Sequence, residues 1–494
     1  MTIQNKDYWL NKQQSLTLPA QAFINGEYTD ASDGGTYDTI NPATGELLVK
    51  TAACTEQDVD RAVAAARDTF DSGVWADKAP AERKGIMKKL AALIMEHHEE
   101  LALMESLNVG KPVQDAMNID IPGSAGCFEW YAEAVDKLYG EVAPTDGNNV
   151  ATITREPIGV VAAVVPWNFP LDIAAWKLAP ALISGNSVVL KPAEQSPLTA
   201  LKLAELAKEA GIPDGVVNVV TGHGHIVGKA LGLHNDVDCL AFTGSTAVGK
   251  LFMGYSAESN LKPVWPETGG KSPNLIFADC DLDAAVEHAV RGIFFNQGEV
   301  CSANSRILIE SSIKDQFAEK FLAAARAMKV GDPLDADTQV GALIDSNHAC
   351  NVRKFITQAG EEGATLLTGG IGDESTAVVE PTIFDNVTED MGIYRDEIFG
   401  PVAALVTFES EAEAIRMAND SIYGLAASLW TTNLNRAHRV SKKLRAGTVS
   451  VNTMDALDFS TPFGGFKQSG FGRDLSLHAI DKFTQLKTTW IKLA

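Results

Sequence analysis

The sequence has little positive charge for its length. Its 494 residues include 41 Lys and Arg against 64 Asp and Glu, which gives a formal net charge of −23 and a pI of about 4.8. Nucleic acids and anionic membranes attract basic proteins, so this balance argues against both as partners. An acidic surface is compatible with simple solvation and with attraction of a cationic substrate, and the composition does not separate the two.

Cysteine and long apolar runs are also scarce. Six cysteines stand far apart, at positions 54, 127, 239, 280, 301 and 350, without a CxxC or Cys/His cluster. We therefore expect no metal site and no disulfide framework. No uncharged apolar stretch reaches about 18 residues, and the first residues lack the basic and apolar segments of a signal peptide. These absences predict a cytoplasmic protein.

Apolar runs of strand length alternate with helical segments through most of the chain. GVVAAVV, NSVVLK, GVVNVV and VDCLAF are typical of strands buried on both faces, and SPLTALKLAELAKEAG between them predicts a helix that Ser196 caps. After Thr268 the alternation begins again, with SRILIE, SIKDQFAEKFLAAARAMKV, PVAALVTF and TVSVN. Crossover connections at this spacing predict parallel sheets.

This alternation predicts an α/β fold with two Rossmann-like parallel-sheet domains and a small β element. Residues 1–138 and 159–268 would form a discontinuous first domain, and residues 269–480 a second one. Residues 139–158 and 481–494 contain segments that alternate in polarity. We expect two strands there, which could pair with another subunit.

Two short motifs place reactive residues beside glycine. FFNQGEVCSANSR places Cys301 after a glycine-containing turn, and a nucleophilic cysteine needs access and a lowered pKa. PETGGKSPN places Glu267 just before Gly269 and Gly270, and a carboxylate among apolar neighbours can act as a general base. Taken alone, each residue is more often structural, as a small buried apolar cysteine or a surface glutamate in a turn.

Further motifs follow predicted strands, at the edge where parallel sheets build their sites. VVPWNFP offers the Asn168 amide to an oxyanion, and KPAEQSP offers Lys191 and Glu194 to the hydroxyls of a ribose. TGHGHIVG and FTGSTAVG place glycines and Ser245 near predicted helix starts, where backbone amides bind phosphate. Neither is a complete GxGxxG after the first strand, and an ordinary turn explains each motif equally well.

Together these motifs resemble the NAD(P)-dependent aldehyde dehydrogenase superfamily along essentially the whole chain. The matching stretches, in the same order, are PWNFP, KPAEQSP, FTGSTAVG, ETGGKSPN, FNQGEVCSANSR, DEIFGPV and PFGGFKQSGFGRD. The resemblance implies that a small-molecule aldehyde is oxidised to its acid through a cysteine thioester, with NAD or NADP as cofactor. It also implies an NAD(P)-binding first domain, a catalytic second domain and an oligomerisation element, in a homodimer or homotetramer.

The resemblance assigns roles to individual residues. Cys301 would be the nucleophile, Glu267 the base that activates the hydrolytic water, and Asn168 part of the oxyanion hole. Lys177 and Asp474 would form a polar pair behind the base; the family often has glutamate at the second position, so we expect a looser pair. Thr268, beside the base, stands where the family often has Leu or Ala. The residues implied in cofactor binding are Val165, Pro166, Trp167, Lys191, Glu194, Gly224, Gly228, Phe242, Gly244, Ser245, Gly249, Gly269, Glu397 and Phe399.

Within the superfamily the chain resembles most the aminoaldehyde branch, which includes γ-glutamyl-γ-aminobutyraldehyde enzymes of putrescine breakdown. WYAEAVDKLYGEV and the tail GRDLSLHAIDKFTQLKTTWIKL carry this resemblance, whereas CSANSR is similar to betaine-type enzymes. The implied substrate tunnel comprises Asp120, Phe169, Asp172, Ile173, Trp176, Phe295, Leu457, Asp458 and Phe463. Aromatic walls with Asp120, Asp172 and Asp458 near the mouth favour a cationic head. Solvated rim carboxylates without a role are equally compatible.

Several alternatives stay open. Betaine aldehyde or a general aliphatic aldehyde is an alternative substrate, and Glu194 favours NAD over NADP without excluding either. A CoA-acylating enzyme would typically lack the water-activating glutamate, so the presence of Glu267 argues against that class. A non-catalytic structural member of the fold is disfavoured because Cys301, Glu267 and Asn168 are all present.

Overall fold

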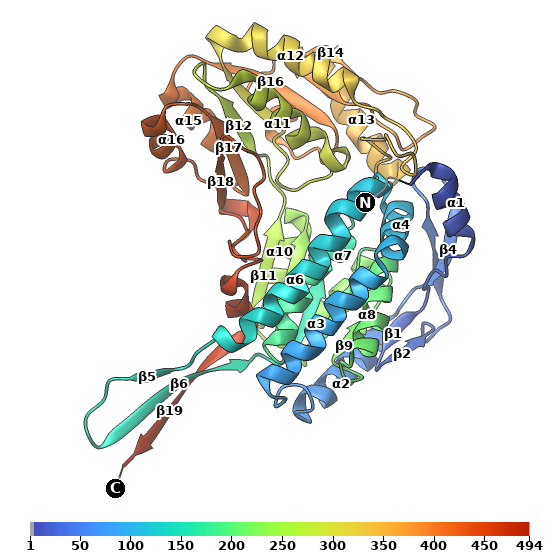
Figure 1. Cartoon of the computed structure of the whole chain (residues 1–494), viewed down its shortest axis with the longest axis vertical. Coiled ribbons are helices and arrows are strands. Elements are labelled where there is room, and N and C mark those ends of the chain that lie inside the picture. Colours follow the sequence, from blue (N-terminus) through green and yellow to red (C-terminus); the bar gives the residue numbers. More distant parts are fainter. Residues whose placement is uncertain (1–3, 494) are drawn as a thin grey trace.

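A computed structural model describes residues 4–493 of the chain (Figure 1). The first sheet has seven strands in the order β11-β10-β7-β8-β9-β1-β2. Their bounds are β1 Ala22–Ile24, β2 Glu27–Thr29, β7 Val160–Val164, β8 Ser187–Lys191, β9 Val217–Val219, β10 Cys239–Gly244 and β11 Val264–Thr268. Strands β7 to β11 are parallel neighbours, and the β1–β2 hairpin adds an antiparallel edge.

Helices cover both faces of this sheet. One apolar core joins one face of the strands to α2 (Glu56–Asp71), α9 (Lys229–Leu233) and α10 (Thr246–Glu258). The opposite core joins them to α7 (Pro170–Ile183) and α8 (Leu198–Ala210) and, further out, to α3 (Pro80–Glu96), α4 (His98–Val109) and α6 (Ile121–Ala134). Helix α8 begins one residue later than predicted: Pro197, not Ser196, occupies the N-cap position.

The second sheet repeats the architecture, with seven strands in the order β14-β15-β16-β13-β12-β17-β18. They are β12 Pro273–Ile276, β13 Arg306–Glu310, β14 Thr365–Thr368, β15 Thr382–Asp385, β16 Val402–Phe408, β17 Ala426–Trp430 and β18 Thr448–Val451. All neighbours are parallel except β14. The helices around it are α11 Leu282–Phe294, α12 Lys314–Ala327, α13 Ser346–Glu361, α14 Gly392–Arg395, α15 Glu411–Asn419 and α16 Leu434–Ser441.

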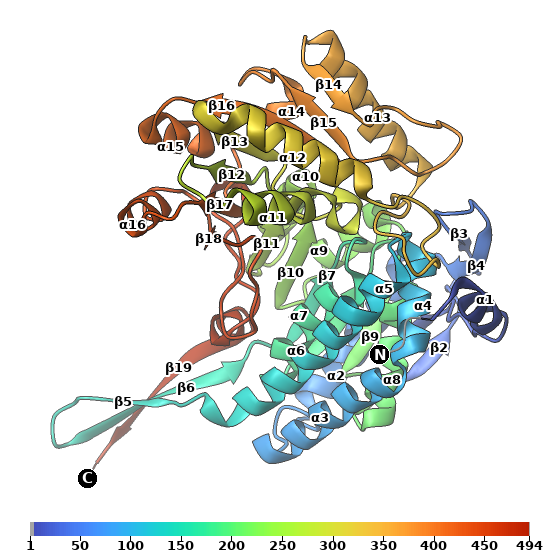
Figure 2. The ribbon, with the colours of Figure 1, turned by 45° about the horizontal axis from the view of Figure 1, so that its top comes forward.

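A three-stranded antiparallel sheet projects from the body of the molecule (Figures 1 and 2). The predicted strands near 151–159 and in the tail are β6 (Asn149–Pro157) and β19 (Thr484–Lys492), and they pair with each other over their whole length. A third strand that the sequence did not indicate, β5 (Glu141–Ala143), pairs with β6. Among the helices of residues 4–493, none is long and apolar enough to cross a membrane.

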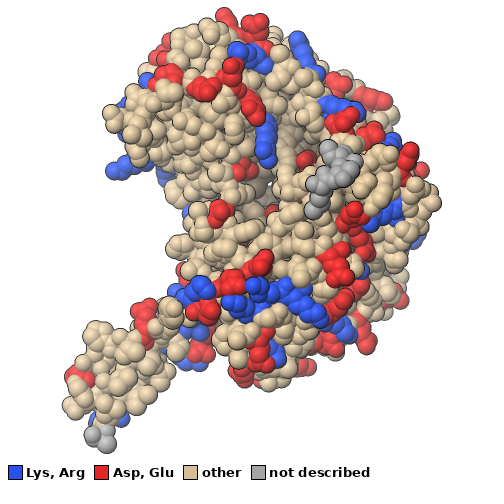
Figure 3. Space-filling model, in the orientation of Figure 1, with Lys and Arg blue, Asp and Glu red and all other residues tan. Residues whose placement is uncertain are grey.

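We call the first sheet with its helices the first lobe, and the second sheet with its helices the second lobe. The N-terminal segment lies against the first lobe. It consists of helix α1 (Lys6–Gln14), the β1–β2 edge hairpin, and a separate hairpin of β3 (Thr36–Ile40) and β4 (Leu47–Ala52). Acidic and basic side chains are interspersed over the face shown in Figure 3, which is hollowed between the two lobes. The projecting sheet carries few charges in this view.

Candidate active site

A cavity of about 550 Å³ lies where the two sheet lobes meet. The carboxyl ends of three parallel strands reach it: β7 leads to Pro166–Asn168, β10 ends at Gly244, and β11 carries Glu267 and Thr268. From the second lobe come Cys301, Glu397 and Phe399. This convergence follows from strand direction, because parallel strands all end at one edge of their sheet.

Fourteen of the predicted site residues line this cavity: Pro166, Trp167, Asn168, Ile173, Trp176, Gly244, Ser245, Glu267, Gly269, Cys301, Glu397, Phe399, Phe463 and Asp474. The others lie outside its lining: Val165, Lys177, Lys191, Glu194, Gly224, Gly228, Phe242, Gly249, Asp120, Phe169, Asp172, Phe295, Leu457 and Asp458. The nucleophile and base candidates, far apart in sequence, thus share one cavity.

Cys301 follows a strained turn. The φ angles are positive at Asn296, Gln297 and Gly298. For the first two this conformation is strained, because L-residues rarely adopt it. A Cβ on Gly270 would lie 2.5 Å from the Cys301 carbonyl oxygen, so glycine there lets the segment after Glu267 approach. Burial raises the pKa of the Cys301 thiol, and the nearby carboxylates of Asp455 and Glu397 add to this. The thiol therefore needs a neighbour that accepts its proton.

Glu267 is a buried carboxyl group without a hydrogen bond. The residue is 4% exposed, and neither Oε1 nor Oε2 has a hydrogen-bond partner among the described residues. Burial and, less strongly, Asp474 raise the pKa of Glu267, whereas Lys482 and Lys177 lower it, and the net result is a pKa of about 7. A Cβ on Gly472 would lie 2.6 Å from Oε1. The glycine-rich PFGGFKQSGFG segment therefore leaves room for an acid poised to exchange protons near neutral pH.

The polar pair predicted behind the base is tight, not loose. Lys177 Nζ lies 2.5 Å from Asp474 Oδ2, and Lys482 Nζ lies 2.6 Å from the other oxygen, Oδ1. The shorter aspartate thus accepts from two ammonium groups. Lys482 was missed by the sequence analysis, because it ends a segment whose pattern indicated only secondary structure.

Asn168 is placed to donate a hydrogen bond into the cavity. Its side chain is 2% exposed, and Nδ2 donates one hydrogen to the Glu299 carbonyl, 2.8 Å away. An amide nitrogen has two hydrogens, so one stays available for an oxyanion. The contact to Glu299 fixes the direction in which that hydrogen points.

The cavity has features that fit a dinucleotide. Helix α10 begins at it, and Ser245 caps this helix by accepting from the Val248 amide at 3.3 Å; the first turn of a helix offers free amides to phosphate. Glu397 Oε1 accepts from the Gly270 amide at 3.0 Å. A Cβ on Gly269 would lie 1.8 Å from Glu397 Oε2, so only glycine leaves the carboxylate this position. Lys191 Nζ lies 3.7 Å from Glu194 Oε2, beside the same sheet edge.

Helix α13 supplies a wall of the cavity that the sequence analysis did not identify. The lining residues on this helix are His348, Asn351, Lys354, Phe355 and Gln358. Their spacing of three and four residues places them on one helix face. Burial lowers the pKa of His348, whose Nε2 lies 2.7 Å from the Phe399 carbonyl oxygen, so the neutral ring donates there. Helical periodicity could have indicated this face, but its residue types carry no motif.

Two of the three aspartates predicted at the tunnel mouth are not solvated there. Asp120 is 1% exposed and its Oδ1 lies 2.8 Å from Lys111 Nζ, so its charge is balanced by an ion pair, contrary to the prediction. Asp172 is half-buried, Oδ1 lacks a partner within residues 4–493, and burial raises its pKa well above the usual value. Asp458 alone is exposed.

Aromatic pairs lie beside these groups. The rings of Phe169 and Phe295 stack with centroids 6.2 Å apart, and Trp176 meets Phe463 edge-on at 5.7 Å. Leu457 is 43% exposed. The predicted tunnel residues thus include two aromatic pairs and the half-buried carboxyl group of Asp172.

The geometry can be compared with known proteins. A family model described as "Aldehyde dehydrogenase family" matches residues 28–489. The NADP/NAD-dependent aldehyde dehydrogenase PuuC of Escherichia coli (strain K12) is 51% identical over 494 residues, covering 100% of both chains. The solved structure of γ-glutamyl-γ-aminobutyraldehyde dehydrogenase from Burkholderia cenocepacia is 54% identical, with a TM-score of 0.97 over 99% of this chain and 100% of that one. An indole-3-acetaldehyde dehydrogenase solved with NAD+ has 54% identity, a TM-score of 0.98 and the same coverage.

Proposed function

Because the chain belongs to the aldehyde dehydrogenase family, we propose that it oxidises a nitrogen-bearing aldehyde to the carboxylic acid, with NAD or NADP accepting the hydride. The observation that carries the proposal is that Cys301, Glu267 and Asn168 line one cavity. That cavity also holds the start of α10 and Glu397, which suit phosphate and ribose groups.

The protein's own groups would act in two stages. Glu267 accepts the thiol proton, and the Cys301 sulfur forms a bond to the aldehyde carbon while Asn168 and a backbone amide donate to its oxygen. A bound nicotinamide supplies the hydride acceptor, and the acyl group is left as a thioester on Cys301. Glu267 releases this first proton to solvent and then takes a proton from water, whose oxygen attacks the thioester carbon. The carbon–sulfur bond breaks, the acid leaves and the Cys301 thiolate is restored.

Glu267 is suited to this double use. Its pKa of about 7 leaves both protonation states populated at neutral pH, which is the condition under which a general base works best. The absence of a hydrogen-bond partner among the described residues leaves both oxygens free to face the thiol or a water molecule.

The substrate class follows from the relatives and from Asp172. PuuC and the Burkholderia enzyme are similar to this chain over its whole length, and the latter is named for an amino-substituted butyraldehyde. Asp172 supports the same class here, because its half-buried carboxyl group would gain an opposite charge from an ammonium or guanidinium head. The rings of Trp176 and Phe463, which line the cavity, would contact the apolar part of such a substrate.

A panel of aldehydes tests the proposal. Initial rates of NADH formation are compared for γ-glutamyl-γ-aminobutyraldehyde, 4-aminobutyraldehyde, 4-guanidinobutyraldehyde, betaine aldehyde and hexanal, with Cys301→Ala as the blank. We expect kcat/KM for a nitrogen-bearing aldehyde to exceed that for hexanal by about tenfold or more. Preference for hexanal would refute the nitrogen-bearing class while leaving the thioester chemistry in place.

The same reaction would separate a catalytic from a vestigial site. Iodoacetamide should label Cys301 stoichiometrically and abolish NADH formation in parallel. Activity that survives complete labelling would remove Cys301 from the reaction.

We also propose that the protein forms a homodimer or homotetramer through the projecting sheet. Val142, Leu486 and Trp490 on this sheet are 74%, 65% and 64% exposed, and burying such apolar area stabilises association. Sedimentation of wild type and of a variant ending at residue 483 tests this, since only the wild type should sediment as an oligomer.

All six cysteines are free thiols, which favours a reducing compartment such as the cytoplasm.

A further inference from the structure

Lys482 places a buried ammonium group beside the proposed catalytic base. It ends the short helix η7 (Leu477–Lys482) and is 2% exposed. Its Nζ lies 2.6 Å from Asp474 Oδ1 and 3.7 Å from Glu267 Oε1. It is the cation that lies nearest to Glu267 among the ion pairs of the described residues.

The charges in this cluster balance only when Lys482 is counted. Two carboxyl groups, Glu267 and Asp474, face two ammonium groups, Lys177 and Lys482. Without Lys482, a buried pair of carboxylates would share one lysine, and like charges at close range disfavour ionisation of both. Lys482 lowers the pKa of Glu267 more than Lys177 does, and Asp474 opposes both.

The other titratable groups around the cluster do not replace Lys482. Arg473 lowers the pKa of Glu267 less than either lysine does, and its guanidinium donates to the carbonyls of Gly465 and Gly472, at 2.9 and 2.6 Å. On the packed elements lie Cys127 and Tyr131 of α6, Cys239 of β10, and Cys301. Burial raises the pKa of each of these four groups, so all are neutral.

The backbone between Asp474 and Lys482 is fixed in a costly conformation. Leu475 and Ser476 have φ of 59° and 53°, in the left-handed region that favours glycine. The Tyr131 hydroxyl donates to the Ser476 carbonyl at 2.9 Å and secures this bend. Such strain persists where surrounding structure holds it in place, and it is frequent near functional groups.

Resting on the proposed role of Glu267 as the base, we propose that Lys482 is a positioning residue that keeps Glu267 ionisable inside the buried site. Its ammonium holds Asp474 between two cations and supplies the second positive charge that the two carboxylates require. Lys482 touches neither the aldehyde nor the cofactor site, so it acts through Glu267 and Asp474.

The pH dependence of deacylation tests this role without a cofactor. The substrate is 4-nitrophenyl acetate, which acylates a thiol and releases nitrophenolate, so the rate after the burst reports hydrolysis of the acyl-enzyme. In Lys482→Met we expect the acid limb, the part of the pH–rate profile where deacylation slows as pH falls, to lie about one pH unit higher than in wild type. Lys482→Arg keeps the charge and should restore the limb toward its wild-type position.

A charge-balanced background separates the electrostatic role from a structural one. Asp474→Asn removes one carboxylate, so its acid limb should lie below that of wild type. The double variant Asp474→Asn/Lys482→Met should lie about one pH unit above Asp474→Asn, because the two differ only at Lys482. This comparison also carries the test if Lys482→Met alone does not fold, as judged by circular dichroism.

Two different failures can be told apart. Equal acid limbs in Asp474→Asn and the double variant, or in folded Lys482→Met and wild type, would overturn the role of Lys482. Unchanged deacylation in Glu267→Gln would instead overturn the proposed base, whatever the behaviour of Lys482.

Discussion

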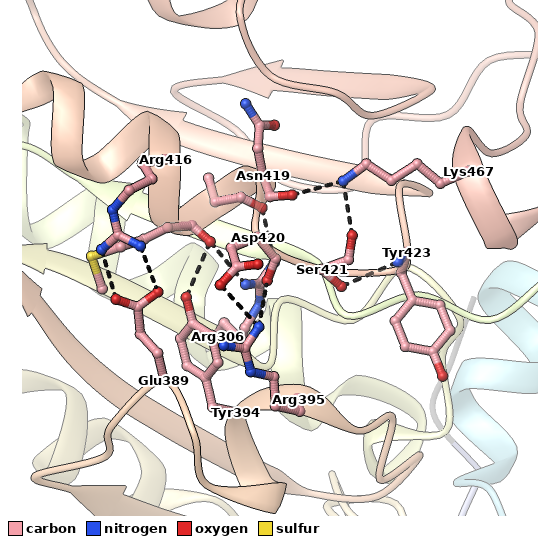
Figure 4. A network of polar contacts seen from close by, with 12 residues as sticks. Arg306, Glu389, Tyr394, Arg395, Arg416, Asn419, Asp420, Ser421, Tyr423 and Lys467 are labelled. Atoms are coloured by element: carbon pink, nitrogen blue, oxygen red, sulfur yellow. Dashed lines mark hydrogen bonds and ion pairs between the residues drawn. The ribbon is translucent and has the colours of Figure 1, made fainter.

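Two buried charged clusters differ in how far their polar atoms are satisfied. In the second lobe, Arg306 is 1% exposed, and its guanidinium donates to the carbonyls of Lys271, Met417 and Ala418 at 2.9 to 3.1 Å. Its neighbours are also engaged: Tyr394 donates to the Met417 carbonyl, and Figure 4 shows Lys467 reaching the carbonyls of Asn419 and Ser421.

Glu267 is almost equally buried but has no hydrogen bond among the described residues. Most buried polar groups in proteins are satisfied, so an exception calls for an explanation. The comparison teaches that a buried charged group with all its hydrogen bonds made holds backbone segments together, whereas a buried carboxyl group without a hydrogen bond costs stability and keeps its reactivity.

The largest effect on activity is expected from removing the unsatisfied carboxyl group. Glu267→Gln keeps the size of the side chain but cannot accept a proton, so kcat for aldehyde oxidation should fall by about 10²–10⁴-fold. Acyl-enzyme should accumulate on Cys301, which mass spectrometry of the quenched protein would detect. A rapid turnover without accumulation would mean that another group activates the water.

The same variant should be more stable than wild type at alkaline pH. Folding raises the pKa of Glu267 to about 7. The contribution of its protonation to the free energy of unfolding is therefore fully present below about pH 4.5 and is lost as pH rises through 7. Unfolding free energies at pH 5 and pH 8 should therefore differ less in Glu267→Gln than in wild type. An equal difference in both proteins would contradict the raised pKa.

Removing the fully hydrogen-bonded Arg306 should instead lower stability and leave catalysis nearly unchanged. Arg306→Met removes a donor from three buried carbonyls, of which only that of Met417 keeps another, such as the Tyr394 hydroxyl. This loss should lower the free energy of unfolding by about 3 kcal/mol or more. The reacting groups are untouched, so kcat at a temperature where the variant is folded should stay within about threefold of wild type. Urea unfolding and initial rates measure the two quantities, and Arg436→Met, at a more exposed pair with Asp279, is the matched control.

The smallest effect is expected at the substrate end. Asp172→Leu and the isosteric Asp172→Asn remove a carboxyl group whose Oδ1 lacks a hydrogen-bond partner among the described residues. Each should lower kcat/KM for 4-aminobutyraldehyde by about tenfold, or about 1.4 kcal/mol. Hexanal should be affected little, because it offers no charge. An equal loss for both aldehydes would show that Asp172 shapes the protein and does not recognise the substrate.

The sequence determined the strands and most of the helices, because fully buried parallel strands need continuous apolar runs and helices need their own period. GVVAAVV became β7 and SRILIE became β13, each within the predicted stretch. The motifs also singled out Cys301, Glu267 and Asn168, and these three residues line one cavity. Local patterns suffice for these features, since strand ends and glycine turns are encoded within a few residues.

Only the tertiary structure decided which charges face one another. Asp120 does not lie at an open tunnel mouth as predicted, because the fold pairs it with Lys111. Asp474 contacts a second cation because η7 places Lys482 beside it. The α13 wall of the cavity likewise depends on how the second lobe packs against the first. Ionisation of a buried group depends on dielectric and on distances of a few ångström between distant parts of the chain, and no local pattern encodes these.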